Sequence, residues 1–163
     1  MFPIVDEDGN TIGTAPRHVC HDGKSFLLHP VVHLHVFNTR GELYLQKRSA
    51  GKDIQPGKWD TSVGGHVCPG ESHPDALMRE ATEELGLSDI IPVFQRRYIW
   101  KSRRERELVH SYKVVTDLVP VVNKDEIDEG RFWSLDEISA CLGKGLFTPN
   151  FEYEFGISGW LNR

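Results

Sequence analysis

The sequence predicts an α/β or α+β fold in which helices cover a mixed β-sheet, and three observations predict it. The chain has 163 residues, enough for one domain with a substantial core and too few for two. Apolar residues make up 39% of the chain and charged residues 26%, which is typical of a globular protein. Strand patterns come first, one amphipathic helix follows, and further strands and helices close the chain, an order typical of a mixed sheet with helices on its faces.

The first strand patterns are short and are separated by turn residues. Phe2–Val5 and Thr11–Thr14 flank the sequence DEDGN, which predicts a small hairpin. Residues 15–24 are polar, and we expect them to be irregular. Val31–Phe37 and Glu42–Lys47 lie on either side of the turn sequence NTRG, so we expect them to form an antiparallel pair of strands.

A short strand over Trp59–Val63 leads toward the amphipathic helix in the middle of the chain. Ser72 is a good helix N-cap, with Asp75 three residues later at the capping-box position. Gly86 is suited to end the helix after Leu85. At about 100° per residue, one side of this helix is apolar and predicts contact with the core through Leu77, Ala81 and Leu85.

The last third of the chain returns to strands and then ends in helices. Val93–Trp100 and Leu108–Val115 predict two strands joined by the charged turn sequence KSRRERE. Phe132–Trp133 predicts a final short strand. Ser134, with a glutamate three residues later, predicts the start of a helix that ends near residue 142. Pro149–Trp160 predicts a last helix, which its two glycines weaken.

Charge and cysteine content narrow the class of protein. The net charge of -5 argues against a nucleic-acid polymer as partner, since such binders usually carry a basic face. The three cysteines are far apart in the sequence, which favours a reducing compartment over a disulfide framework. The N-terminus lacks the pattern of a signal peptide, and no apolar run is long enough to span a bilayer. We therefore expect a cytoplasmic protein with no membrane partner.

The central helix carries an unusual concentration of carboxylates. Glu80, Glu83 and Glu84 are related as i, i+3 and i+4, so their side chains converge on one face. Arg79 can pair with Glu83 but cannot neutralise all three carboxylates. A divalent cation could neutralise them. Carboxylate oxygens are hard ligands that suit Mg²⁺, with Mn²⁺ as the alternative. The competing interpretation is a solvated helix face, which is the commoner fate of a glutamate-rich turn.

The spacing of the residues around these glutamates favours the interpretation as a metal site. The stretch from Gly65 to Leu87 resembles the signature of the Nudix hydrolases at every position: glycine, five residues, glutamate, seven residues, Arg-Glu, an aliphatic residue, any residue, Glu-Glu, any residue, glycine, aliphatic. The aliphatic position inside the helix is filled by the small Ala81. The order of strands on both sides is also similar to that family. The resemblance implies a Nudix α/β/α sandwich with a mixed β-sheet, formed as one domain by residues 1–163 with the signature at 65–87.

The resemblance also implies an activity and a role for each matching residue. Nudix hydrolases cleave a diphosphate linked to another group, usually with Mg²⁺. Glu80 and Glu84 would be the main metal ligands, Glu83 would share the metals or handle the attacking water, and the Gly64 carbonyl would add a ligand. Arg79 would orient the glutamates, and Glu71 would brace the loop. The general base stays open between Glu83 and two glutamates of the charged turn, Glu105 and Glu107.

Within the family, the sequences on either side of the signature resemble those of isopentenyl diphosphate isomerase and its hydrolase-like relatives. The matching sequences are LHP, VFN, GEL, PGKW and SVGGH. Isomerases use a histidine-rich metal site, of which His29 and His66 match two ligands and His21 lies within a residue of a third. Gly64 stands where they keep a catalytic cysteine, and the isomerases' second essential acid aligns near His110. Both departures favour hydrolysis over isomerisation.

Three functions therefore remain open. The first is Mg²⁺-dependent hydrolysis of a nucleoside diphosphate derivative or another organic diphosphate, and the second is isopentenyl diphosphate isomerisation. The third is a ligand sensor without turnover, which the intact glutamates oppose. Dimers are common among Nudix proteins, so a homodimer is one expected state. Cations before the signature (Lys47, Arg48, Lys52 and Lys58) could steer a phosphate or form a solvated loop.

Overall fold

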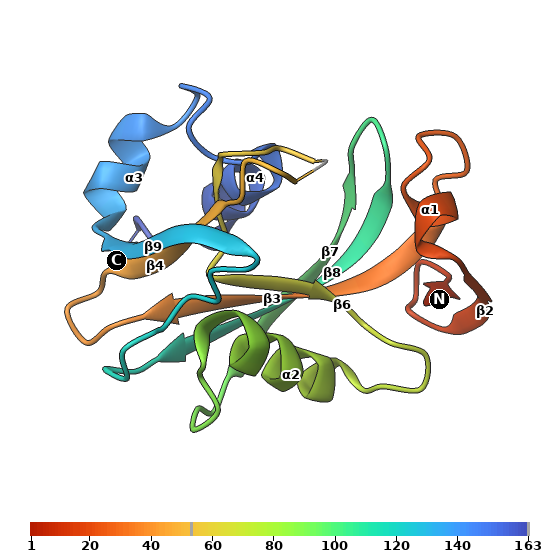
Figure 1. Ribbon diagram of the computed structural model, residues 1–163, viewed down its shortest axis with the longest axis horizontal. Coiled ribbons are helices and arrows are strands. Elements are labelled where there is room, and N and C mark those ends of the chain that lie inside the picture. The colour runs from red at the N-terminus through yellow and green to blue at the C-terminus, as the bar shows by residue number, and fades with distance from the viewer. Residues whose placement is uncertain (53, 163) are drawn as a thin grey trace.

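The computed structural model of the protein describes residues 1–52 and 54–162 (Figure 1). Its elements in chain order are β1 (Phe2–Val5), β2 (Thr11–Ala15), α1 (Arg17–Cys20), β3 (Leu28–Phe37), β4 (Leu43–Arg48), β5 (Trp59–Asp60), β6 (Val63–His66), α2 (His73–Leu85), β7 (Val93–Lys101), β8 (Arg106–Val115), β9 (Ile127–Trp133), α3 (Leu135–Cys141) and α4 (Pro149–Ser158). Most predicted strands and the three longer helices are confirmed with small shifts at their ends, but the single strand expected over Trp59–Val63 is divided into β5 and β6, and the strand expected at Phe132–Trp133 begins at Ile127. The segment expected to be irregular before β3 contains the short helix α1.

Strand β3 is the centre of a mixed sheet. It runs parallel to β8 along its whole length, from Leu28 beside Arg106 to Phe37 beside Val115. On its other side, the first half of β3 pairs antiparallel with β6. Strand β7 continues the sheet beyond β8. The expected mixed sheet is therefore confirmed.

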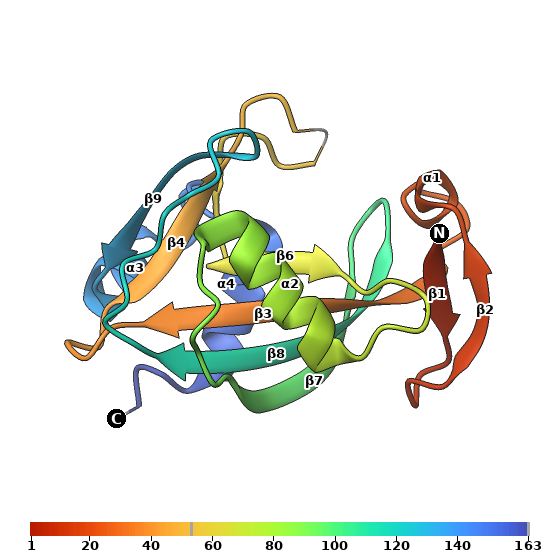
Figure 2. The same ribbon diagram turned by 60° about the horizontal axis from the view of Figure 1, so that its bottom comes forward.

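The sheet divides on the side of β3 that lies opposite β8. Strands β3 and β4 are antiparallel, as expected, but they pair only at Phe37 and Leu43, next to their turn. Strand β4 instead pairs with β9 and, at its far end, with β5. Figure 2 shows β4 and β9 turning away from β3 while β6 stays alongside it. The division leaves room for a cavity between the two branches.

The two faces of β3 differ in chemistry because side chains alternate along a strand. Val32, Leu34 and Val36 point to one face and are buried against the apolar stripe of α2. His29, His33 and His35 point to the opposite face, which α4 covers at one end. Figure 1 shows α2 and α4 on opposite sides of the sheet. One strand thus supplies core on one face and ionisable side chains on the other.

Helix α2 forms as its sequence predicts. The Ser72 hydroxyl accepts a hydrogen bond from the Asp75 backbone N–H at 3.2 Å, which caps the start. Gly86 ends the helix with a φ of 64°, a left-handed conformation that suits glycine. Leu77, Ala81 and Leu85 are buried, as expected. The helix axis is therefore fixed against the sheet, and its glutamate face is held in one position.

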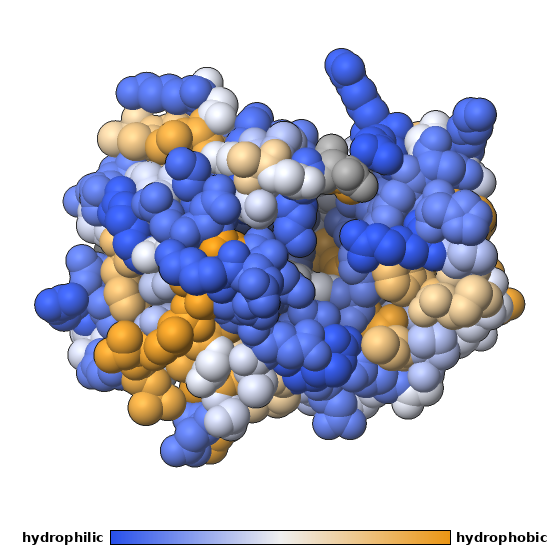
Figure 3. Space-filling view, viewed as in Figure 1, coloured by the Kyte–Doolittle hydropathy of each residue, from blue (hydrophilic) through white to orange (hydrophobic). Residues whose placement is uncertain are grey.

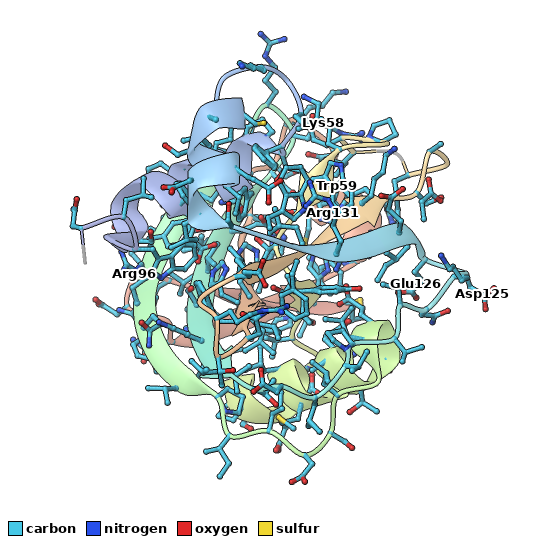
Figure 4. The ribbon with its side chains drawn as sticks, turned by 90° about the vertical axis from the view of Figure 1, so that its left-hand side faces the viewer. Lys58, Trp59, Arg96, Asp125, Glu126 and Arg131 are labelled. Atoms are coloured by element: carbon cyan, nitrogen blue, oxygen red, sulfur yellow. The ribbon has the colours of Figure 1, made fainter. Side chains whose placement is uncertain are left out.

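A second apolar cluster lies between β4, β9, α3 and α4. Its aromatic members are Phe37, Trp59, Trp133, Phe147, Phe151, Phe155 and Trp160. The guanidinium of Arg131 covers the Trp133 ring, 3.5 Å from its centroid, and lies close to Trp59, as Figure 4 shows. Arg96 donates hydrogen bonds to the carbonyls of Ile157 and Ser158. These contacts tie the C-terminal end of α4 to β7.

The N-terminal hairpin carries the chain to the start of β3. Strands β1 and β2 form a separate two-stranded sheet, and α1 then turns the chain so that His21 lies beside His29 and His66. Within the described residues, no helix has both the length and the apolar character needed to cross a membrane.

Candidate functional site

A cavity of about 510 Å³ opens between the two branches of the sheet. Figure 3 shows the surface hollowed between the β4–β5 loop and α1. The residues that the sequence singled out in and around the signature for metal binding or catalysis contribute to its lining: Gly64, Arg79, Glu80, Glu83, Glu84, Glu105 and Glu107. The roles of these residues remain predictions, but the structure brings them to one place.

Glu84 is the most buried carboxylate of α2, only 6% exposed. One of its oxygens accepts a hydrogen bond from the Gln46 amide at 2.7 Å. The other oxygen, Oε2, is buried without a hydrogen-bond partner in the described part of the chain. Burial, together with neighbouring Glu80, raises the pKa of Glu84 well above its ordinary value, and burial also raises the pKa of Glu80. Two adjacent carboxylates with an unpaired buried oxygen fit a divalent cation.

Arg79 holds the frame around these carboxylates. Its Nε and one terminal nitrogen donate to the two oxygens of Glu71 at 2.9 and 3.0 Å, a bidentate pair. Its other terminal nitrogen donates to Glu80 at 2.8 Å. The terminal nitrogen that donates to Glu71 also donates to the His66 carbonyl at 3.0 Å, which links α2 to β6. The Arg79 hydrogen bond lowers the pKa of Glu71 to about 2, so Glu71 is an ionised brace.

Glu83 differs from its two neighbours because it is open to solvent. Its side chain is 53% exposed, and its carboxylate lies 3.7 Å from Arg79. It nevertheless lines the cavity with Glu80 and Glu84. Solvent exposure thus differs across the glutamate face, with Glu84 buried and Glu83 open to solvent.

The two glycines of β6 point to opposite faces of the sheet. A Cβ atom at Gly65 would lie 2.3 Å from the carboxyl carbon of Glu80, closer than any side chain could tolerate. Gly64 instead lies opposite His33, and a Cβ there would be 3.6 Å from the imidazole ring, an ordinary contact. Gly65 therefore permits the close approach of α2, while Gly64 leaves open space beside His33.

A histidine cluster lies at the α1 end of the cavity. His21, His29, His66 and Glu105 each offer one ligand atom, and these atoms lie within 4.8 Å of one another. The Nε2 atoms of His29 and His66 are buried without hydrogen-bond partners in the described chain. Burial lowers the pKa of His66 to about 2, so its ring is neutral, the form that binds metals. The structure thus gathers His29 and His66, which match two ligands of the isomerase metal site, with His21, which lies within a residue of a third, and adds Glu105.

Glu107 and His110 face opposite sides of β8. Glu107 is buried on the cavity side, and burial followed by neighbouring Glu105 raises its pKa to about 8. His110 is on the α2 side, where its ring stacks on His73 with centroids 3.6 Å apart. Strand alternation thus turns His110 away from the cavity and leaves the nearby Glu107 as the acid inside it.

Sequence reasoning missed Glu154, a buried glutamate on α4. Its carboxylate pairs with His33 Nδ1 at 2.9 Å and with His35 Nε2 at 3.0 Å. Burial would raise the pKa of Glu154, but the two imidazoles hold it well below its ordinary value. His33 and His35 lie two residues apart on one face of β3, and both are buried. Two histidines on one strand face were the available signal that a buried acid lies opposite.

The cations before the signature divide between the cavity and the surface. Arg48 and Lys52 line the cavity, whereas Lys47 and Lys58 do not. Arg48 is paired with Asp60 at 3.3 Å. Of the tryptophans whose places the sequence left open, Trp100 lines the cavity, while Trp59 and Trp133 belong to the core.

The chain is similar to a known domain family and to individual proteins. The model of the NUDIX domain family matches residues 27–151. An isopentenyl-diphosphate Delta-isomerase of Agromyces mediolanus is 38% identical over 133 residues, which cover 78% of this chain and 64% of that protein. The chain thus spans less than two thirds of that relative. An uncharacterized Nudix hydrolase of Pseudomonas aeruginosa is 32% identical over 132 residues, covering 81% of this chain and 77% of that protein.

Solved structures show the same fold. The crystal structure of DR0079 from Deinococcus radiodurans superposes with a TM-score of 0.82 at 22% identity, over 96% of this chain and 98% of that one. At this identity the likeness supports the α/β/α arrangement with its mixed sheet and carries no information on substrate.

Proposed function

The chain belongs to the Nudix family, and on this premise we propose that it is a hydrolase that cleaves a diphosphate bond with Mg²⁺, or with Mn²⁺ in its place. The substrate is a nucleoside diphosphate derivative or another organic diphosphate. The observation that carries the proposal is the carboxylate pair of Glu80 and Glu84, which lines the cavity and leaves a buried oxygen of Glu84 without a partner.

The residues of α2 and β6 would hold the cation. Glu80 and Glu84 are its main ligands, with Glu83 and the Gly64 carbonyl completing the set. When bound, the cation neutralises charge on the diphosphate and lowers the pKa of a coordinated water. Arg79 fixes the Glu80 carboxylate through its 2.8 Å hydrogen bond, while Glu71 fixes Arg79.

The general base is one of two carboxylates of the cavity. Glu83 is open to solvent and lines the cavity, so its carboxylate is within reach of an attacking water. Glu107, whose pKa is raised to about 8 by burial, holds a proton at neutral pH and suits the donor role better. We therefore assign the base to Glu83 and proton donation toward the leaving group to Glu107.

A substrate panel tests the function. Purified protein is incubated with Mg²⁺ and nucleoside diphosphate derivatives or other organic diphosphates, and released phosphate or monophosphate is measured. Glu84→Gln should reduce kcat about 100-fold or more, because it removes a charged ligand from the most buried point of the site. Glu129→Gln, which removes an exposed charge from β9 outside the cavity, should retain wild-type kcat. Equal kcat values in Glu84→Gln and Glu129→Gln would show that the glutamate face of α2 takes no part in catalysis.

Isopentenyl diphosphate isomerisation is the second candidate function. The histidine cluster with Glu105 favours it, and Glu107 supplies an acid inside the cavity. Gly64 opposes it, since no thiol is available at that point of β6. Incubation with isopentenyl diphosphate should therefore give no dimethylallyl diphosphate. Formation of dimethylallyl diphosphate would show that the protein is an isomerase and not a hydrolase. Tight binding of a diphosphate without any turnover would instead favour a ligand sensor.

A further inference from the structure

An indole ring forms part of the cavity wall near the end of β7. The chain has four tryptophans, and Trp100 is the one that lines the cavity. Trp59, Trp133 and Trp160 are at most 7% exposed and belong to the apolar cluster beside α4. Neither that cluster nor the proposed metal face accounts for Trp100.

Strand pairing places this indole beside the proposed proton donor. Trp100 is paired with Glu107 across β7 and β8, and the side chains of paired residues lie on the same face of a sheet. Both residues line the cavity. Figure 1 shows the β7–β8 hairpin between α4 and α1. The indole and the glutamate face of α2 thus line one cavity from different elements, so a ligand held at the glutamates can place a second group against Trp100.

Helix α4 holds the indole in position. The Trp100 ring is in tilted contact with Tyr153, with centroids 5.4 Å apart, and Tyr153 also contacts Tyr98 at 5.3 Å. Tyr98 in turn accepts a hydrogen bond from the Asn150 amide at 2.9 Å. Within the part of the chain that the structure describes, Tyr153 is the only ring that contacts Trp100. The orientation of the indole is therefore fixed from α4, and its cavity side is not covered by another ring.

Polar groups lie next to the indole along β7. Ser102 follows Trp100 by two residues, and Asn150 is bonded to Tyr98, which precedes Trp100 by two residues. Ser102 and Asn150 both line the cavity. The Asn150 amide nitrogen is used by Tyr98, and its Oδ1 has no hydrogen-bond partner within the described residues. An aliphatic ligand would leave these polar groups unpaired, whereas a planar ligand with polar edges would not.

These features together suit a nucleobase. Phe2 is the other benzenoid ring of the cavity wall, but it is already stacked on His66, with centroids 4.2 Å apart and planes 5° apart. Every nucleobase has a π-face that can stack on an aromatic side chain. The cavity volume of about 510 Å³ is in the range of small-molecule sites. Trp100 is thus the open aromatic surface of a cavity large enough for a nucleotide.

We propose that the indole of Trp100 stacks on the base of a nucleoside diphosphate derivative whose diphosphate lies at the glutamate face of α2. Trp100 is then a specificity-determining residue, and Tyr153 is a positioning residue that holds it. The inference rests on the proposed function for its diphosphate, and it narrows the substrate class from any organic diphosphate to a nucleotide. The competing explanation is that Trp100 only packs against Tyr153 to hold α4.

Two substitutions of Trp100 separate stacking from packing. Trp100→Phe keeps an aromatic face, whereas Trp100→Leu keeps an apolar side chain and removes the π-face. Phe94→Leu is the matched control, because Phe94 is an aromatic residue of the same strand that is 52% exposed and does not line the cavity.

Isothermal titration calorimetry with Mg²⁺ present compares two ligands, the α,β-methylene analogue of ADP and methylenediphosphonate, which lacks the nucleoside. Trp100→Leu should bind the nucleotide analogue about tenfold more weakly than the wild type, and Trp100→Phe should stay within about threefold. All three variants should bind methylenediphosphonate within about twofold of the wild type. A role in packing alone would lower the melting temperature of Trp100→Leu without separating the two ligands.

Tryptophan fluorescence gives an independent measurement. Since Trp100 lines the cavity and the other tryptophans are buried, the nucleotide analogue should quench the emission of the wild type. Trp100→Phe should lose this quenching while it keeps its affinity. If Trp100→Leu does not fold, these two results in Trp100→Phe decide.

Three results would overturn the inference. They are an equal loss of affinity for both ligands in Trp100→Leu, wild-type affinity of this variant for the nucleotide analogue, and a wild type that binds the nucleotide analogue no more tightly than methylenediphosphonate. Hydrolysis of nucleoside diphosphate derivatives with wild-type kcat/KM in Trp100→Leu would refute the inference and leave the hydrolase. Nucleotide binding that depends on Trp100, in a protein that hydrolyses no diphosphate, would support the inference and refute the hydrolase.

Discussion

At the scale of the residue, the absence of a side chain at Gly65 leaves room for the end of the Glu80 side chain. The Glu80 carboxyl occupies the space in which any other residue would place its Cβ atom. The signature glycine is therefore explained by packing, since its neighbour Gly64 has no comparable restriction. The need for a glycine was visible in the sequence, but its reason was not, because it depends on how closely the helix lies.

Replacing Gly65 and replacing Gly64 should affect stability differently. Gly65→Ala should lower the free energy of unfolding by about 1–3 kcal/mol, because the new methyl group displaces Glu80 or the helix. It should also reduce diphosphate hydrolysis, because Glu80 moves. Gly64→Ala should change the melting temperature by no more than about 2 °C, since its Cβ makes an ordinary contact. Thermal melts followed by circular dichroism compare the two, and equal melting temperatures would contradict the packing explanation.

At the scale of the element, α4 is joined to β3 by ionisable groups as well as by apolar packing. Burial alone would lower the pKa of His33, but the Glu154 carboxylate raises it to about 9. A group whose folded pKa is raised stabilises fully below its unfolded value, here 6.5, and loses that contribution as the pH rises through 9. The pKa of Glu154 is depressed, so its carboxylate stays ionised over this range.

The attachment of α4 should therefore weaken in alkali. The wild-type melting temperature should fall between pH 7 and about pH 10, as His33 loses its proton. Glu154→Gln should be less stable at pH 7 and should show a smaller fall over the same range. Glu152→Gln, which changes a glutamate of the same helix that accepts a hydrogen bond only from the Gly143 backbone, should keep the wild-type profile. Parallel profiles for wild type and Glu154→Gln would show that the pair does not stabilise the fold.

At the scale of the whole molecule, carboxylates from α2 and β8 and the loops between the strands converge on one cavity. Without a cation, burial raises the pKa of both Glu80 and Glu84, and the charge of Glu80 adds to the shift at Glu84, so the folded chain disfavours the ionised form of this pair. A cation that binds the folded chain alone would stabilise the whole domain by mass action.

Metal addition should therefore be visible without any substrate. Saturating Mg²⁺ should raise the melting temperature of chelator-treated protein by about 5–10 °C, the equivalent of about 2.7 kcal/mol at 100 times the dissociation constant. Glu84→Gln should lose most of this shift, whereas Glu129→Gln should keep it. Differential scanning calorimetry measures both, and a wild type that does not respond to Mg²⁺ or Mn²⁺ would exclude the proposed site.

Much of this organisation could be predicted from local pattern, and the rest depends on contacts between distant segments. Alternation and capping residues gave the strands and α2, and the spacing of the glutamates gave the acidic face. The pairing of β4 with β9 could not be read from adjacent strand patterns, because it joins segments about 85 residues apart. Glu154 was missed for the same reason, since it is recognisable only once α4 lies over His33 and His35.

The alternation along β3 has a consequence for how this chain could change over generations. Substitutions at Val32, Leu34 and Val36 alter the support beneath α2, whereas those at His29, His33 and His35 alter the chemistry of the opposite face. Selection can therefore act on the two sets almost separately, although they alternate residue by residue. A library of all single substitutions in β3 should show tolerance with a period of two when scored for abundance, and the opposite phase when scored for turnover. Such a strand would let new specificities arise on an unchanged scaffold.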